Sequence, residues 1–111
     1  MVIFFATKKL LRDCNDSRLL IKRYGERTAQ LIRRRLDELR AAETLDVMRA
    51  LPQTRCHELT GDRRGQLAVD LDHPRRLVFK PCEPVQRKPD GGLDWKRTTA
   101  IQILKVVDYH G

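Results

Sequence analysis

The pattern of apolar and polar positions divides the chain into a helical first half and a strand-rich second half. Residues 2–6 are wholly apolar and predict a short buried strand at the start. A helical pattern begins at Lys8, is interrupted by Asn15-Asp16-Ser17, and resumes until Gly25. The clearest helix is predicted over residues 26–42, where apolar side chains recur every three or four positions, at Ala29, Ile32, Leu36 and Leu39. Thr44 should then cap a shorter helix over 45–51, which Pro52 stops.

Beyond Pro52 the apolar period changes from about 3.6 to 2. Residues 56–60, 66–71 and 75–80 predict three strands that are joined by turn sequences, and therefore an antiparallel meander. Residues 81–97 are rich in proline and glycine and predict a surface loop. The last strand is expected over residues 98–107. Because both its sides are largely apolar, it should lie inside the sheet.

Composition limits the possible classes of protein. A chain of 111 residues supports one hydrophobic core, so we expect a single domain over residues 1–111. Twenty-three Lys and Arg against 15 Asp and Glu give a net charge of +8, which favours a polyanionic partner. This partner could be nucleic acid, an anionic membrane or an acidic protein. No apolar run approaches the roughly 18 residues of a spanning helix, and the first residues do not resemble a secretion signal. We therefore expect no membrane insertion and a cytoplasmic protein.

Common catalytic motifs are missing from the sequence. It has no glycine-rich phosphate loop, nucleophile elbow or helical His-x-x-x-His pair. Cys14, Cys56 and Cys82 have no zinc-like spacing and cannot all pair, so we expect reduced structural thiols and neither metal nor cofactor. Cleavage of RNA remains possible without a metal, because the ribose 2′-OH is an internal nucleophile. Histidine can supply the proton acceptor and donor near neutral pH, and the candidates are His57 and His110. His73 lies in a turn and is expected to be a surface residue.

The basic residues fall into two groups. Arg27 and Arg40 have acidic neighbours on the predicted helix and are expected to form a solvated face. A second set clusters around one hairpin and gives the candidate RNA contacts, namely Arg63, Arg64, Arg75, Arg76 and Lys80. Among the aromatic residues, Trp95 is expected to cover the core, and Tyr109 is the better candidate for stacking on a base.

Two stretches carry a family resemblance. Residues 55–69, RCHELTGDRRGQLAV, with PRRLVF at 74–79, resemble the H-x-L-x-G-D-R-x-G segment and the following strand of HigB-type toxins in the RelE/ParE superfamily. The Asp108-Tyr109-His110 sequence resembles their terminal D-Y-H. The resemblance implies a RelE-like α+β fold, in which an N-terminal strand and helices pack on one face of a twisted antiparallel sheet. It also implies inhibition by a helix-turn-helix antitoxin. Thr60 departs from the pattern, since relatives often have lysine there.

The resemblance also implies the site, which carries over to His57, Arg76, Asp108, Tyr109 and His110. The expected activity is that of a ribosome-dependent endoribonuclease that cuts mRNA by 2′-OH attack. One histidine would act as base and the other as acid, and the sequence does not assign these roles. Arg76 would stabilise phosphate charge, Asp108 would orient an imidazole, and Tyr109 would stack or relay a proton. Two alternatives remain open: a ParE-like gyrase poison and a non-catalytic basic RNA-binding module.

Overall fold

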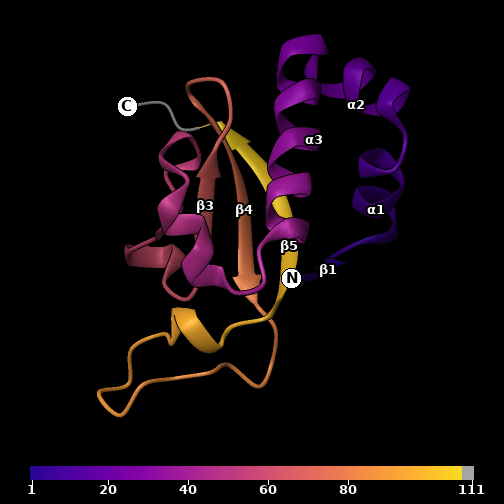
Figure 1. Cartoon of the computed structure of the whole chain (residues 1–111). Coiled ribbons are helices and arrows are strands. Elements are labelled where there is room, and N and C mark those ends of the chain that lie inside the picture. The colour runs from indigo at the N-terminus through magenta and orange to yellow at the C-terminus, as the bar shows by residue number, and fades with distance from the viewer. Residues whose placement is uncertain (109–111) are drawn as a thin grey trace.

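A computed structural model of the protein describes residues 1–108, which form an α+β structure (Figure 1). Its α-helices are α1 (Lys8–Cys14), α2 (Ser17–Tyr24) and α3 (Glu26–Ala41). Its strands are β1 (Val2–Phe5), β2 (His57–Glu58), β3 (Leu67–Asp70), β4 (Arg75–Pro81) and β5 (Ala100–Asp108). Short 3-10 helices occupy the connections: η1 (Leu45–Ala50), η2 (Pro52–Thr54), η3 (Gly61–Arg63) and η4 (Trp95–Arg97).

Local sequence accounts for the helix boundaries. The Thr7 hydroxyl accepts from the Leu10 N–H at the start of α1, and the Asp16 carboxylate accepts from the Arg18 N–H at the start of α2. Gly25 separates α2 from α3 with φ of +87°, a backbone conformation that glycine adopts without steric cost. The break at residues 15–17 and the helix predicted over 26–42 are both confirmed.

The sheet has the order β1-β5-β4-β3-β2 and is mixed. The meander β2-β3-β4-β5 is antiparallel, as predicted, but β1 runs parallel to β5. The prediction of an antiparallel sheet was therefore wrong for its first strand. Along the sequence, the three helices come between β1 and the meander. A connection of this length allows the strands that it joins to be either parallel or antiparallel. β5 lies between β1 and β4, which confirms its predicted place inside the sheet.

One face of the sheet is covered by α3 and the segment η1, and the hydrophobic core lies between these layers (Figure 1). We call it the helix face. The sheet contributes Leu67, Val69, Leu77, Phe79, Ile101 and Ile103, all at most 1% exposed. Trp95, from the 82–99 connection, is buried in the same cluster and closes its edge, as expected. That connection extends beyond the end of the sheet, in orange in Figure 1.

The opposite face of the sheet, here called the open face, is defined by register. Residues that pair directly across antiparallel strands have their side chains on the same face. His57 pairs with Ala68, Ala68 with Val78, and Val78 with Lys105. Ala68 and Val78 are fully buried, yet they do not belong to the core cluster beneath α3. The open face therefore has a small apolar floor of its own.

One local prediction needs correction, and one strand has an irregularity. Residues 45–50 form a 3-10 helix and not an α-helix, and the Thr44 side chain makes no cap hydrogen bond. Pro52 opens the next 3-10 turn, so the chain takes two tight turns here. In β5, a register shift opposite Val78 and Phe79 pairs Phe79 with Ile103 and Leu77 with Val106. This irregularity places Ile103 and Val106 on the same face, whereas uninterrupted alternation would separate them.

Candidate functional site on the open face

His57 lies in the edge strand β2, and its side chain is half-buried on the open face. Its Nδ1 is 2.6 Å from the carbonyl oxygen of Arg55. A carbonyl oxygen can only accept a hydrogen bond, so Nδ1 carries the proton in this contact. In a neutral imidazole, the lone pair then lies on Nε2. His57 thus has the tautomer that a proton acceptor at Nε2 requires.

Arg76 lies on the same face, in β4, and is paired with Asp70 of β3. Its Nε is 3.3 Å from Asp70 Oδ1, while Nη1 of Arg55 is 3.4 Å from Asp70 Oδ2. One carboxylate therefore holds two guanidinium groups. From the strand spacings, the Cα atoms of Arg76 and His57 are roughly 12 Å apart, close enough for their side chains to reach one bound strand of RNA.

Arg75 is the neighbour of Arg76 in sequence but lies on the helix face. Its Nη1 donates to the hydroxyl of Thr28 at 2.6 Å and is 3.6 Å from Asp72. The Thr28 hydroxyl in turn donates to Asp72 at 2.7 Å. These contacts tie the β3–β4 turn to the first part of α3. The structure therefore separates Arg75 from Arg76, although both belong to the predicted basic cluster.

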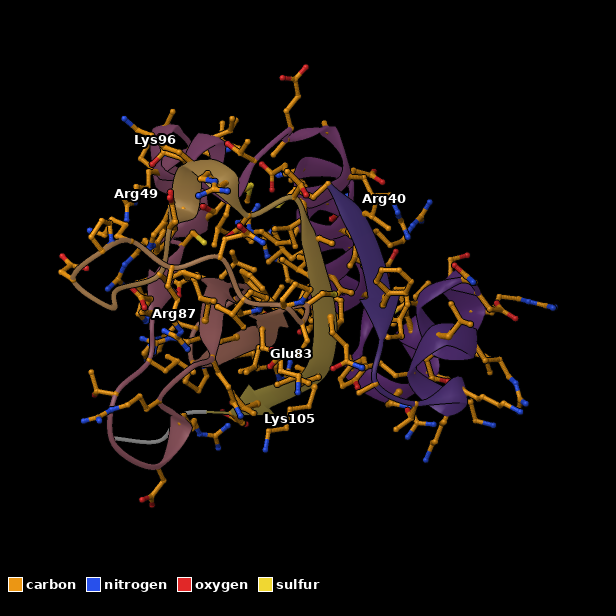
Figure 2. All side chains as sticks on the ribbon, turned by 90° about the horizontal axis from the view of Figure 1, so that it is seen from below. Arg40, Arg49, Glu83, Arg87, Lys96 and Lys105 are labelled. Carbon is orange, nitrogen blue, oxygen red and sulfur yellow. The ribbon has the colours of Figure 1, made fainter. Side chains whose placement is uncertain are left out.

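The remaining predicted RNA contacts lie on two elements. Lys80 is exposed on β4 and, two residues beyond Val78, has its side chain on the open face. Arg64 is exposed and Arg63 half-buried in the β2–β3 connection. Lys105, which the sequence analysis did not single out, lies opposite Val78 and projects on the side of the sheet away from α3 (Figure 2).

The predicted C-terminal site residues are only partly described. Asp108 ends β5 and is exposed, and it pairs with Arg75, so the register places it on the helix face at the end of the strand. Tyr109 and His110 lie outside the described residues. Within residues 1–108, the structure thus brings His57, Arg76 and Lys80 to one face and places Arg75 and Asp108 on the other.

Arg55 and Asp70 are further candidate site residues that the sequence analysis missed. Asp70 could have been found by alternation, because it lies two residues from Ala68 in a strand and hence on the same face. No sequence signal marks Arg55, which stands out only in the folded chain. It has φ of +43° and is the only non-glycine residue with positive φ in the described range 1–108. A left-handed backbone costs an L-residue about 1–2 kcal/mol, and such outliers concentrate at functional sites.

Comparison of the sequence with known protein families and with curated proteins gives no match. In the described part of the chain, no three His, Cys, Asp or Glu side chains gather where they could hold a metal ion. Nor is any helix in residues 1–108 long and apolar enough to cross a membrane. The open-face geometry is therefore the main guide to function.

Proposed function

We propose that this protein is a toxin of the RelE/ParE superfamily, of HigB type, that cleaves mRNA on the ribosome and is inhibited by a helix-turn-helix antitoxin. The observation that carries the proposal is the arrangement of His57 on the open face, with its Nδ1 proton held by a backbone carbonyl and Arg76 two strands away. Among residues 1–108, no α-helix covers the open face, and Arg76, Lys80 and Lys105 lie on it (Figure 1). Such a surface suits an extended single strand. The assignment to this family, the dependence on the ribosome and the inhibition by an antitoxin rest on the sequence resemblance.

In the proposed reaction, Nε2 of His57 accepts the proton of a ribose 2′-OH. The 2′-oxygen attacks the adjacent phosphorus, and the bond from phosphorus to the 5′-oxygen breaks. The leaving oxygen takes a proton from a general acid, and the products are a 2′,3′-cyclic phosphate and a 5′-OH end. Arg76 stabilises the negative charge that builds on the phosphate. The proposal gives the role of general acid to His110, the second histidine of the site that the resemblance implies, because nearby anionic groups favour the protonated imidazole.

The test is brief expression of the protein, followed by mapping of new mRNA 5′ ends relative to ribosomal A sites. Wild type should cut within translated codons, and His57→Ala should lower cleavage about 10²–10⁴-fold, because it removes positioned proton transfer. His57→Gln is the matched variant, since it keeps a polar side chain but cannot act as a base. Undiminished cleavage by both variants would exclude the proposed mechanism. DNA cleavage by gyrase would favour the gyrase poison, and RNA binding without any cutting would favour the non-catalytic module.

A further inference from the structure

Arg55 holds two parts of the site at once. Its backbone is left-handed at φ +43°, an arrangement that places its carbonyl oxygen against His57 Nδ1 at 2.6 Å. Its side chain reaches Asp70, where Nη1 lies 3.4 Å from Oδ2. No other described non-glycine residue has positive φ. The chain thus adopts this unfavourable conformation at a residue that contacts both the candidate base and the Asp70 carboxylate, which also pairs with Arg76.

The guanidinium of Arg55 is placed to receive an anion. The side chain is 69% exposed, and its contact with Asp70 is longer than the 2.7–2.9 Å of a close charge-assisted hydrogen bond. Arginine has five N–H donors in a planar arrangement that matches phosphate oxygens. Asp70 thus restrains the guanidinium, while the Arg55 side chain remains largely exposed.

The surroundings of Arg55 suit an anion as large as a phosphate. A pocket of about 80 Å³ lies beside it, larger than the ~10–15 Å³ that one water needs. Its charged lining consists of Arg55, Arg75 and Arg76 with the carboxylate of Asp70. Arg75 is also paired with Asp72, so the three guanidinium groups face two carboxylates and leave a formal balance of +1. Such a pocket, adjacent to the open face, fits a group that carries negative charge on several oxygens.

We propose that Arg55 binds a phosphate group of the RNA strand next to the one cleaved at His57, and that its carbonyl positions the His57 ring. Asp70 holds the guanidinium ready and competes with the phosphate for it. This inference rests on the proposed function, because it names the RNA contact that places the strand over His57. It makes Arg55 a binding and positioning residue.

The first test measures binding of a 2′-O-methyl RNA octamer, which cannot be cleaved, by fluorescence anisotropy over a salt series. Arg55→Gly keeps the left-handed backbone and the carbonyl, but removes the guanidinium. The slope of log affinity against log salt should become less steep by about 0.7, the value for one phosphate contact on a single strand. Arg40→Ala, on the side of α3 remote from Lys105 in Figure 2, removes the same charge and should leave the slope unchanged.

Two further variants keep this test decisive. Arg55→Asn also tolerates a left-handed backbone and should repeat the loss if Arg55→Gly folds poorly. Asp70→Asn should strengthen octamer binding, because it removes the competing carboxylate. In both Arg55 variants the ¹⁵N shifts of His57 should remain those of the Nδ1-protonated ring. An unchanged slope in folded Arg55→Gly and Arg55→Asn would overturn the inference.

The cleavage assay separates this inference from the proposed function. If wild type cuts mRNA, Arg55→Gly should raise KM and leave kcat nearly unchanged, as expected for a contact made equally in the ground and transition states. If wild type cuts no mRNA but Arg55→Gly still lowers the binding slope, the proposed function fails and the phosphate site stands. If wild type cuts mRNA with the same KM as Arg55→Gly, the phosphate site fails and the nuclease stands.

Discussion

At the scale of single residues, the three thiols differ in how far their surroundings suppress ionisation. Burial, with a contribution from the neighbouring Asp13, raises the pKa of Cys14 to about 11. Burial raises the pKa of Cys56 to about 12 and also raises the pKa of Cys82. Because the thiolate is the reactive form, all three should be less reactive than an ordinary cysteine. The predicted role as structural thiols is consistent with these surroundings.

Alkylation rates should follow these pKa values. Relative to a free thiol of pKa 9.0, Cys56 at pH 8 should have a thiolate fraction about 1000-fold lower and Cys14 about 100-fold lower. Iodoacetamide labelling, followed by peptide mass spectrometry, should therefore modify both slowly in the folded protein and fast in urea. Rapid labelling of Cys56 in native protein would show that the thiol is exposed by opening of the η2–β2 region.

The raised pKa of Cys56 also predicts that the stability of the protein depends on pH. A thiol with a raised folded-state pKa favours folding below its unfolded pKa, and this contribution is lost as pH rises from about 9 through the folded value of about 12 for Cys56. Cys56→Ala should therefore show a smaller decrease in the free energy of unfolding between pH 8 and pH 10.5 than wild type.

At the scale of elements, the buried side chain of Arg35 connects α3 to two other segments. It is 5% exposed, and its Nε donates to the Asp70 carbonyl at 2.7 Å. Nη2 donates to the Gln53 carbonyl at 3.1 Å, and Nη1 pairs with Glu38 at 2.8 Å. Gln53 precedes Arg55 by two residues, and Asp70 is the ion-pair partner of Arg55. The helix thus fixes the backbone on both sides of the Arg55–Asp70 contact.

Removal of this arginine should be costly. Arg35→Met removes the donor to two part-buried carbonyl oxygens and one of the two donors to Glu38, whose Oε2 still accepts from Gln53 Nε2. We therefore expect a loss of about 3 kcal/mol in the free energy of unfolding. Arg34→Ala, the neighbouring exposed arginine on α3, should change it by less than about 0.5 kcal/mol. Urea denaturation measures both. A small loss in Arg35→Met would mean that packing alone holds α3 on the sheet.

Elements whose signal is local could be predicted from the sequence, and those that depend on distant pairing could not. The helix expected over 26–42 and the observed Glu26–Ala41 agree because a 3.6-residue period is visible along the chain itself. The parallel direction of β1 and the irregularity in β5 arise from contacts between segments about 100 residues apart or across strands. Neither leaves a pattern in the local sequence.

The candidate site likewise contains residues that the sequence could predict and residues that it could not. His57 and Arg76 were predicted because the residue types suit RNA chemistry and the resemblance selected them. Arg75 and Arg76 have the same side chain and adjacent positions, so only the register shows that they lie on opposite faces. Arg55 was missed because its left-handed backbone and its contact with Asp70 are properties of the folded chain.

At the scale of the whole molecule, basic residues are present on both sides of the sheet. Arg40 and Arg27 lie exposed on α3, whereas Lys80 and Lys105 lie exposed on the open face. A net charge of +8 attracts any polyanion. At physiological salt, however, exposed charges that are more than about 8 Å apart are largely screened from one another. Tight binding of the proposed RNA substrate should therefore depend on which face contacts it, and not on the total charge alone.

Two double variants with the same net charge distinguish these effects. Lys80→Ala/Lys105→Ala should make the salt dependence of ribosome or RNA-octamer binding shallower by about 1.4, since each lost phosphate contact on a single strand contributes about 0.7. Arg27→Ala/Arg40→Ala removes two charges from α3 and should leave the slope close to that of wild type. Both substitutions affect exposed side chains, so the thermal midpoints should stay near that of wild type. Equal slopes in the two double variants would show that net charge governs binding and that the open face has no special role. A loss confined to the α3 variant would place the RNA on the helices and remove His57 from contact with it.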